Sequence, residues 1–106
     1  MVQEITPKAL KARLDAGEII PIIDIRESWE LQQSRLDEAI HIPMNDIPDS
    51  LDQIPTDKPV VIMCHLGQRS AMVVDWMVGQ GYDNLYSLEG GIDAWADEVD
   101  PSVIVS

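Results

Sequence analysis

The segment that most constrains this chain is an unbroken apolar run at residues 60–63, followed directly by a cysteine and a short loop that contains glycine. The run has the length and the β-branched content of a buried strand. Residues 71–78 have the pattern of a helix, so this part of the chain is predicted to fold as strand, tight loop and helix.

The rest of the chain shows the same alternation of strands and helices. Further strands are predicted over residues 19–24, 39–42 and 84–88, and helices over residues 7–16, 28–33, 46–54 and from Gly90-Gly91 to a point before Pro101. Thr6 and Pro7 support the first helix as its N-cap and first-turn residues. Strands that alternate with helices favour an α/β domain with a parallel sheet.

Cys64 is the only cysteine, and its position between a strand and a helix is typical of a reactive thiol. Unpaired N–H groups and the dipole at a helix N-terminus favour a negatively charged sulfur. No proline interrupts residues 65–70, so each of them keeps an N–H that can point at an anion. Gly67 allows the loop to curl, and Arg69 adds a permanent cation. The sequence therefore predicts an anion-binding cradle around a nucleophile.

Four segments follow one another along the chain, namely Asp24-Ile25-Arg26-Glu27 with Trp29-Glu30, residues 39–43, Cys64-His65-Leu66-Gly67-Gln68-Arg69-Ser70 and residues 89–95. In this order they resemble the single-domain rhodaneses, which are sulfurtransferases that carry a sulfane sulfur as a cysteine persulfide. The segment at residues 64–70 resembles the active-site loop of that family. The resemblance extends over almost the whole chain.

The resemblance implies one domain over residues 1–106, a small doubly wound α/β fold with a mostly parallel five-stranded sheet flanked by helices. It implies a sulfurtransferase of the thiosulfate sulfurtransferase type, which takes sulfur from thiosulfate or a persulfide and passes it to a thiol or to a protein acceptor. The residues that it implies are Cys64 and Arg69 for catalysis and His65, Leu66, Gly67, Gln68 and Ser70 for substrate binding. No cofactor and no metal are expected.

Two other functions remain open at this stage. The domain could be a persulfide relay that donates sulfur to a protein such as a ubiquitin-like sulfur carrier, or it could be a noncatalytic binding or regulatory module. The presence of Cys64 argues against the last. Cys64 and Arg69 are also one residue closer in sequence than the matching pair of cysteine phosphatases, so the cradle should be smaller and should suit a persulfide sulfur better than a phosphate.

Several residues receive a structural interpretation. Asp24 and Arg26 are interpreted as a structural pair, with catalysis by either left open, and His41 as structural. His65 either contacts the donor or is an exposed loop side chain. Trp29, Trp76 and Trp95 are predicted to be core residues. Residues 34–38 lack the glycines and the histidine that many relatives carry there, which predicts an altered surface loop.

The chain is strongly acidic, with 7 Lys and Arg against 19 Asp and Glu and a formal net charge of −12. This balance argues against nucleic acid as a partner and predicts either a solvated surface or a docking surface for a basic protein. No run approaches the roughly 18 apolar residues of a membrane span, and the first residues lack the pattern of a secretory signal. We therefore expect a cytoplasmic protein that does not interact with membranes.

Overall fold

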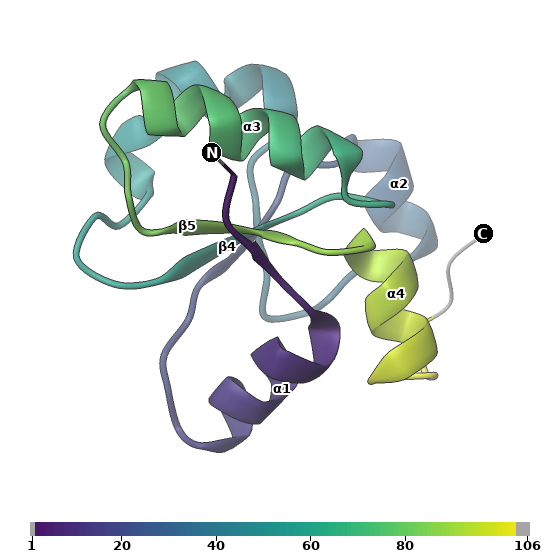
Figure 1. Ribbon diagram of the computed structural model, residues 1–106. Coiled ribbons are helices and arrows are strands. Elements are labelled where there is room, and N and C mark those ends of the chain that lie inside the picture. Colours follow the sequence, from purple (N-terminus) through teal and green to yellow (C-terminus); the bar gives the residue numbers. More distant parts are fainter. Residues whose placement is uncertain (1, 104–106) are drawn as a thin grey trace.

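The computed structural model describes residues 2–103 and places one sheet between layers of helices (Figure 1). The strands are β1 (Glu4–Ile5), β2 (Ile22–Asp24), β3 (Ile40–His41), β4 (Val60–Met63) and β5 (Leu85–Leu88). The α-helices are α1 (Pro7–Asp15), α2 (Ser28–Gln33), α3 (Gln68–Gly79) and α4 (Gly91–Glu98). Two 3₁₀ helices, η1 (Met44–Asp49) and η2 (Leu51–Gln53), follow β3.

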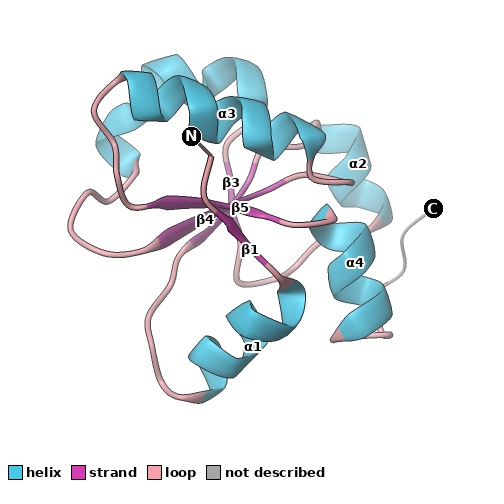
Figure 2. Cartoon of the chain, viewed as in Figure 1, coloured by secondary structure: helices cyan, strands magenta, loops and turns pink. Residues whose placement is uncertain are grey.

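The described strands are all parallel and have the order β1-β5-β4-β2-β3. They form the magenta layer between the helices in Figure 2. Parallel neighbours need a crossover connection, and α3 provides it between β4 and β5. Helix α3 lies on one side of the sheet, whereas α1 and α4 lie on the other (Figure 1). The predicted doubly wound sheet of five strands flanked by helices is thereby confirmed.

Strand β4 lies at the centre of the sheet and is buried on both faces. Val60 and Ile62 belong to the core that also contains side chains of α3, while Val61 and Met63 belong to the core on the opposite face, with side chains of α1 and α4. All four side chains are fully buried, and each such burial stabilises the fold by roughly 1.5–3 kcal/mol. Burial on both faces explains why the run is apolar without alternation.

Two strands are shorter than the sequence pattern predicts, namely β2 inside the sheet and β3 at its edge, which forms over Ile40–His41 instead of residues 39–42. The predicted strand over residues 19–24 forms only from Ile22, because Ile19 is exposed and Pro21 has no N–H to donate. The carbonyl of Pro21 still accepts a hydrogen bond from the N–H of Val61 at 2.9 Å. Strand β1, which pairs with β5, was not predicted from residue patterns, since two residues are too few to show a period.

The tryptophan prediction was wrong for two of the three residues. Trp95 is 7% exposed and belongs to the core beside α1, but Trp29 is 61% exposed and Trp76 is 41% exposed. Trp29 lies in the first turn of the short helix α2, and Trp76 lies on α3 between core residues that face the sheet. Whether each ring is buried depends on which face of its helix points toward the sheet, and residue type alone does not reveal that face.

The parallel arrangement brings the carboxyl ends of the strands to one edge of the sheet. Asp24 and His41 are the last residues of neighbouring strands and are paired in register, and Cys64 follows the last residue of β4. In open parallel sheets this edge is where ligands bind. The fold therefore places the cysteine loop where a functional site is expected.

Candidate active site

Cys64 lies at the floor of the site, with only 1% of its surface exposed. Its sulfur accepts hydrogen bonds from the N–H of Gly67 at 3.1 Å and from the N–H of Ser70 at 3.3 Å. Ser70 is in the first turn of α3, so its N–H is one of those that the helix itself leaves without a partner. The loop thus surrounds the sulfur with donors that favour negative charge on it.

Glycines allow the loop to fold this tightly. Gly67 has φ of 99°, and a Cβ there would lie 3.0 Å from the N of Gly90. A Cβ on Gly91 would overlap the carbonyl groups of Cys64 and His65. Those carbonyls instead accept hydrogen bonds from the first turn of α4, at 2.9 Å from Ile92 N–H and at 3.1 Å from Asp93 N–H. The N-terminus of α4 therefore holds the cysteine loop in place.

A pair of buried serines lies behind the sulfur. The Sγ of Cys64 is 3.4 Å from the Oγ of Ser70, which is 2.7 Å from the Oγ of Ser87 in β5. The Ser70 hydroxyl also donates to the carbonyl of Gly67 at 3.1 Å. Both serines are fully buried. Ser87 has no signature in the sequence, because no local pattern connects it to Ser70, which lies 17 residues away.

Arg69 is held by the carboxylate of Glu30, a residue to which the sequence pattern assigns no role. Its Nη1 and Nη2 donate to the two oxygens of Glu30, in α2, at 2.8 and 2.9 Å. Glu30 is buried, and it also accepts a hydrogen bond from the N–H of Glu27 at 3.0 Å. The sequence predicts Arg69 as a permanent cation of the loop, and the structure shows that this cation is paired with Glu30.

The hydrogen bonds from Arg69 lower the pKa of Glu30 to about 2, with a further contribution from the Glu27 N–H and against the opposing effect of burial. The same hydrogen bonds raise the pKa of Arg69. Arg69 also interacts electrostatically with Cys64 and with Asp24. The pair is therefore ionised at neutral pH and places a partly neutralised guanidinium beside the thiol.

Asp24 and Arg26 form a second, more deeply buried pair at the end of β2. Arg26 Nε and Nη2 donate to the Asp24 carboxylate at 3.0 and 2.9 Å, and both side chains are at most 2% exposed. Nη2 also donates to the carbonyl of Ser34 at 2.7 Å, and His41 Nε2 lies 2.7 Å from the Arg26 carbonyl oxygen. These contacts fit the structural interpretation of all three residues, because they connect β2, β3 and the end of α2.

The opening above the sulfur is small. A pocket of about 90 Å³ is lined by Cys64, His65, Leu66, Gln68 and Arg69. This volume corresponds to about three water molecules, at roughly 30 Å³ each. Leu66 is 54% exposed and Gln68 is also exposed, so both lie at the rim. Together with Gly67 and Ser70, which contact the sulfur, the predicted loop residues are all brought together around Cys64.

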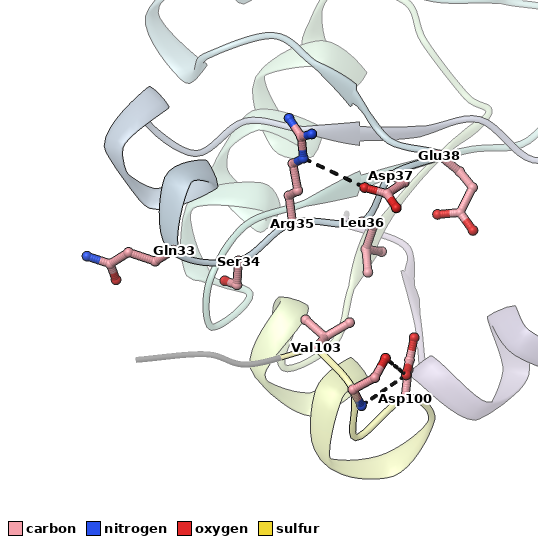
Figure 3. A pocket seen from close by; sticks show the side chains of 9 residues that line it. Gln33, Ser34, Arg35, Leu36, Asp37, Glu38, Asp100 and Val103 are labelled. Atoms are coloured by element: carbon pink, nitrogen blue, oxygen red, sulfur yellow. Dashed lines mark hydrogen bonds and ion pairs between the residues drawn. The ribbon is translucent and has the colours of Figure 1, made fainter.

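A larger hollow, of about 380 Å³, lies at a different place, between residues 34–38 and the turn that follows α4 (Figure 3). Arg35 and Asp37 form a long ion pair of 3.7 Å across its rim, and Asp100 accepts hydrogen bonds from Ser102. This is the atypical segment singled out in the sequence. Within residues 2–103 no cluster of three or more His, Cys, Asp or Glu could hold a metal, and no helix is long and apolar enough to cross a membrane.

Comparison with known proteins agrees with this geometry. A sulfurtransferase of Allochromatium vinosum is 40% identical over 96 residues, which cover 91% of this chain and 90% of the relative. The putative sulfurtransferase YtwF of Bacillus subtilis is 36% identical over 100 residues, which cover 94% of this chain and 96% of the relative.

The crystal structure of a rhodanese-like domain protein from Staphylococcus aureus has the same fold, with a TM-score of 0.84 at 32% identity over 99% of both chains. The rhodanese-like domain matches residues 6–98, from the N-cap of α1 to the end of α4. Because the match spans residues 6–98 and includes β2, β3, β4 and β5 together with the cysteine loop, the chain belongs to the rhodanese-like domain family.

Proposed function

We propose that this protein is a sulfurtransferase that carries a sulfane sulfur as a persulfide on Cys64. The observation that supports the proposal most strongly is the position of the sulfur, which is buried at the end of β4, accepts two backbone N–H bonds and opens only into a small pocket. Such a site stabilises a thiolate and excludes bulky competitors. The names of the two relatives, both sulfurtransferases, support the same reaction class.

The reaction balances without a redox cofactor. The Cys64 thiolate attacks the outer sulfur of thiosulfate, the new S–S bond forms, and the bond between the two thiosulfate sulfurs breaks so that sulfite leaves with the electron pair. Cyanide, or a thiolate in its place, then attacks the outer sulfur of the persulfide. The acceptor leaves with that sulfur, as thiocyanate in the case of cyanide, and the Cys64 thiolate is restored.

The remaining residues of the loop stabilise negative charge during the reaction and determine how the sulfur donor fits into the pocket. The pocket has room for the sulfur being transferred, while the oxygens of thiosulfate would remain at the rim, near Arg69 and Gln68. The N–H groups of Gly67 and Ser70 stabilise the thiolate that attacks and that leaves again. The guanidinium of Arg69 offsets part of the negative charge of the donor. Only part of its positive charge is available, because the carboxylate of Glu30 is paired with it.

Steady-state transfer of sulfur from thiosulfate to cyanide tests this function. Cys64→Ser and Cys64→Ala should both lose the activity while keeping the wild-type circular dichroism spectrum, because either change removes the nucleophile and little volume. Activity in the folded Cys64→Ser protein at a rate comparable to wild type would show that another residue carries the sulfur.

A protein acceptor is favoured by one specific observation, which is the exposed Leu66 at the rim of the pocket. A small anion gains nothing from this apolar side chain, whereas a protein surface can cover it. The persulfide would attack the adenylated carboxyl terminus of a ubiquitin-like sulfur-carrier protein with loss of AMP, and an added thiol reductant would then cleave the S–S bond to release the carrier thiocarboxylate and the Cys64 thiolate. Leu66→Ser should therefore slow transfer to this carrier more than it slows transfer to cyanide. An equal loss with both acceptors would remove this second candidate.

A further inference from the structure

Ser87 is a buried polar residue for which the sulfur chemistry described above has no use. It lies in β5, fully buried, with its hydroxyl 2.7 Å from that of Ser70 and 3.5 Å from the carbonyl of Gly67. Burial of a hydroxyl costs free energy unless the group is hydrogen-bonded, and an apolar residue would suit a central strand of this sheet better. The contact with Ser70 is therefore the feature of Ser87 that needs a functional explanation.

The hydrogens can be assigned for the neutral thiol. The S–H of Cys64 donates to the oxygen of Ser70, and the Ser70 hydroxyl donates to the carbonyl of Gly67. The hydroxyl of Ser87 then donates to the oxygen of Ser70, since the single hydrogen of Ser70 is already used. In this state the Ser70 oxygen accepts two hydrogen bonds and donates one.

The assignment changes when the sulfur loses its proton. The thiolate is an acceptor only, so the 3.4 Å contact is favourable if the Ser70 hydrogen turns from Gly67 toward the sulfur. The Gly67 carbonyl keeps a partner, because it also accepts from the N–H of Ala71 at 3.2 Å. The Ser70 oxygen has now lost the S–H donor, and Ser87 supplies the donor that remains.

We propose that Ser87 is a positioning residue that keeps the Ser70 oxygen hydrogen-bonded while the Ser70 hydroxyl donates to the charged sulfur of Cys64. Two hydrogen bonds then run from the Ser87 hydroxyl to the Ser70 oxygen and from the Ser70 hydroxyl to the sulfur of Cys64. Both donate toward the negative charge, and successive hydrogen bonds in this arrangement strengthen one another. Ser87 thus favours the thiolate over the thiol although it does not contact the sulfur. The proposal rests on the proposed function, because the sulfur that it serves is the one that takes up sulfane sulfur.

The experiment measures the rate at which iodoacetamide alkylates Cys64 as a function of pH. Without the Ser87 hydroxyl the Ser70 oxygen keeps its donor in the thiol and loses it in the thiolate, so Ser87→Ala should move the midpoint upward. The loss of one hydrogen bond of ordinary net strength corresponds to a rise of about half to one pH unit in this midpoint. Below the midpoint, the variant should therefore be alkylated about three to ten times more slowly than wild type.

Two comparisons separate this effect from a general change of the core. Threonine and valine side chains have the same shape, so any strain in the core is common to Ser87→Thr and Ser87→Val. Only threonine keeps the hydroxyl. The pH midpoint of alkylation should therefore stay near the wild-type value in Ser87→Thr and rise in Ser87→Val. Tyr86→Phe removes a hydroxyl from the next residue of β5, where Tyr86 interacts with Arg13, and should not move it. The charged groups near the sulfur are unchanged in all these variants, namely Arg69 of the loop, Glu30 of α2 and Asp24 of β2, together with the neighbouring His65.

The proposal is overturned if Ser87→Ala alkylates with the wild-type profile, if Thr and Val behave alike, or if Tyr86→Phe produces the same shift. Alkylation does not require sulfur transfer. A shifted midpoint in a protein that transfers no sulfur would therefore support the role of Ser87 and count against the proposed function, whereas an unshifted midpoint in an active enzyme would do the reverse.

Discussion

The ion pair between Glu30 and Arg69 connects α2 to the cysteine loop, and Glu30→Gln tests its contribution. Glutamine has nearly the same shape as glutamate and can still accept the hydrogen bond from the N–H of Glu27. It cannot accept two charge-assisted bonds from the guanidinium. The substitution therefore removes the charge of this contact while it preserves the start of the helix.

The size of the effect follows from the pKa of Glu30. The drop in this pKa from 4.5 to about 2 corresponds to about 3 kcal/mol, at roughly 1.36 kcal/mol per pH unit. This is an upper value, because the Arg69 side chain is 35% exposed and water screens the pair. After that reduction we expect Glu30→Gln to lower the free energy of unfolding at pH 7 by about 1–2 kcal/mol.

The same pKa fixes the pH dependence. Because the pKa of Glu30 is lower in the folded protein than in the unfolded chain, its contribution is complete above about pH 5 and is lost as the pH falls from 4.5 toward 2. Urea unfolding of both proteins at pH 7, 5, 4 and 3 should give a difference in stability that shrinks over the last two steps.

A matched control is the exposed pair of Arg13 and Glu18, which has similar bidentate geometry on the surface. Glu18→Gln should leave the stability nearly unchanged at every pH, because exposed pairs contribute little. The reasoning would be refuted by a Glu30→Gln protein as stable as wild type at pH 7, or by a difference that stayed constant down to pH 3.

Substitutions at three further residues test the geometry and the charge of the loop. Gly67→Ala should destabilise the protein by about 1–2 kcal/mol in urea unfolding and reduce sulfur transfer, since φ is 99° and the new Cβ would lie 3.0 Å from Gly90 N. Gly91→Ala should lower the melting temperature more than Gly67→Ala does, because its Cβ would overlap the carbonyls of the cysteine loop. Arg69→Ala should reduce the catalytic efficiency with thiosulfate by about one to two powers of ten and Arg69→Lys by less; unchanged efficiency in the folded Arg69→Ala protein would limit Arg69 to its bond with Glu30.

The sequence predicted those features that are local in the chain. The strand at residues 60–63, the glycine loop and the following helix were recognised because a buried strand, a glycine and a helix start each have a short-range signature. Helix α3 begins three residues before the predicted start, at Gln68, since the loop residues around Arg69 already form its first turn.

The features that were not predicted are contacts between distant segments. Glu30 contacts Arg69, 39 residues further along the chain, and Ser70 contacts Ser87, 17 residues further along, and neither contact produces a periodic pattern in the sequence.

The predicted helix over residues 46–54 forms as two 3₁₀ helices, with Pro48 inside the first. The helical segment starts at Met44, and a continuous α-helix from that residue would require an N–H of residue 48 to donate to the Met44 carbonyl, which proline cannot do.

The central claim is that the sulfur of Cys64 accepts one sulfur atom and holds it as a persulfide. Intact-protein mass spectrometry after a brief incubation with thiosulfate, followed by removal of the excess donor, tests this claim most directly. The account predicts that wild-type protein gains the mass of one sulfur atom, that cyanide removes it, and that Cys64→Ser gains nothing. Wild-type protein that gains no sulfur, or Cys64→Ser protein that gains as much as wild type, would contradict it.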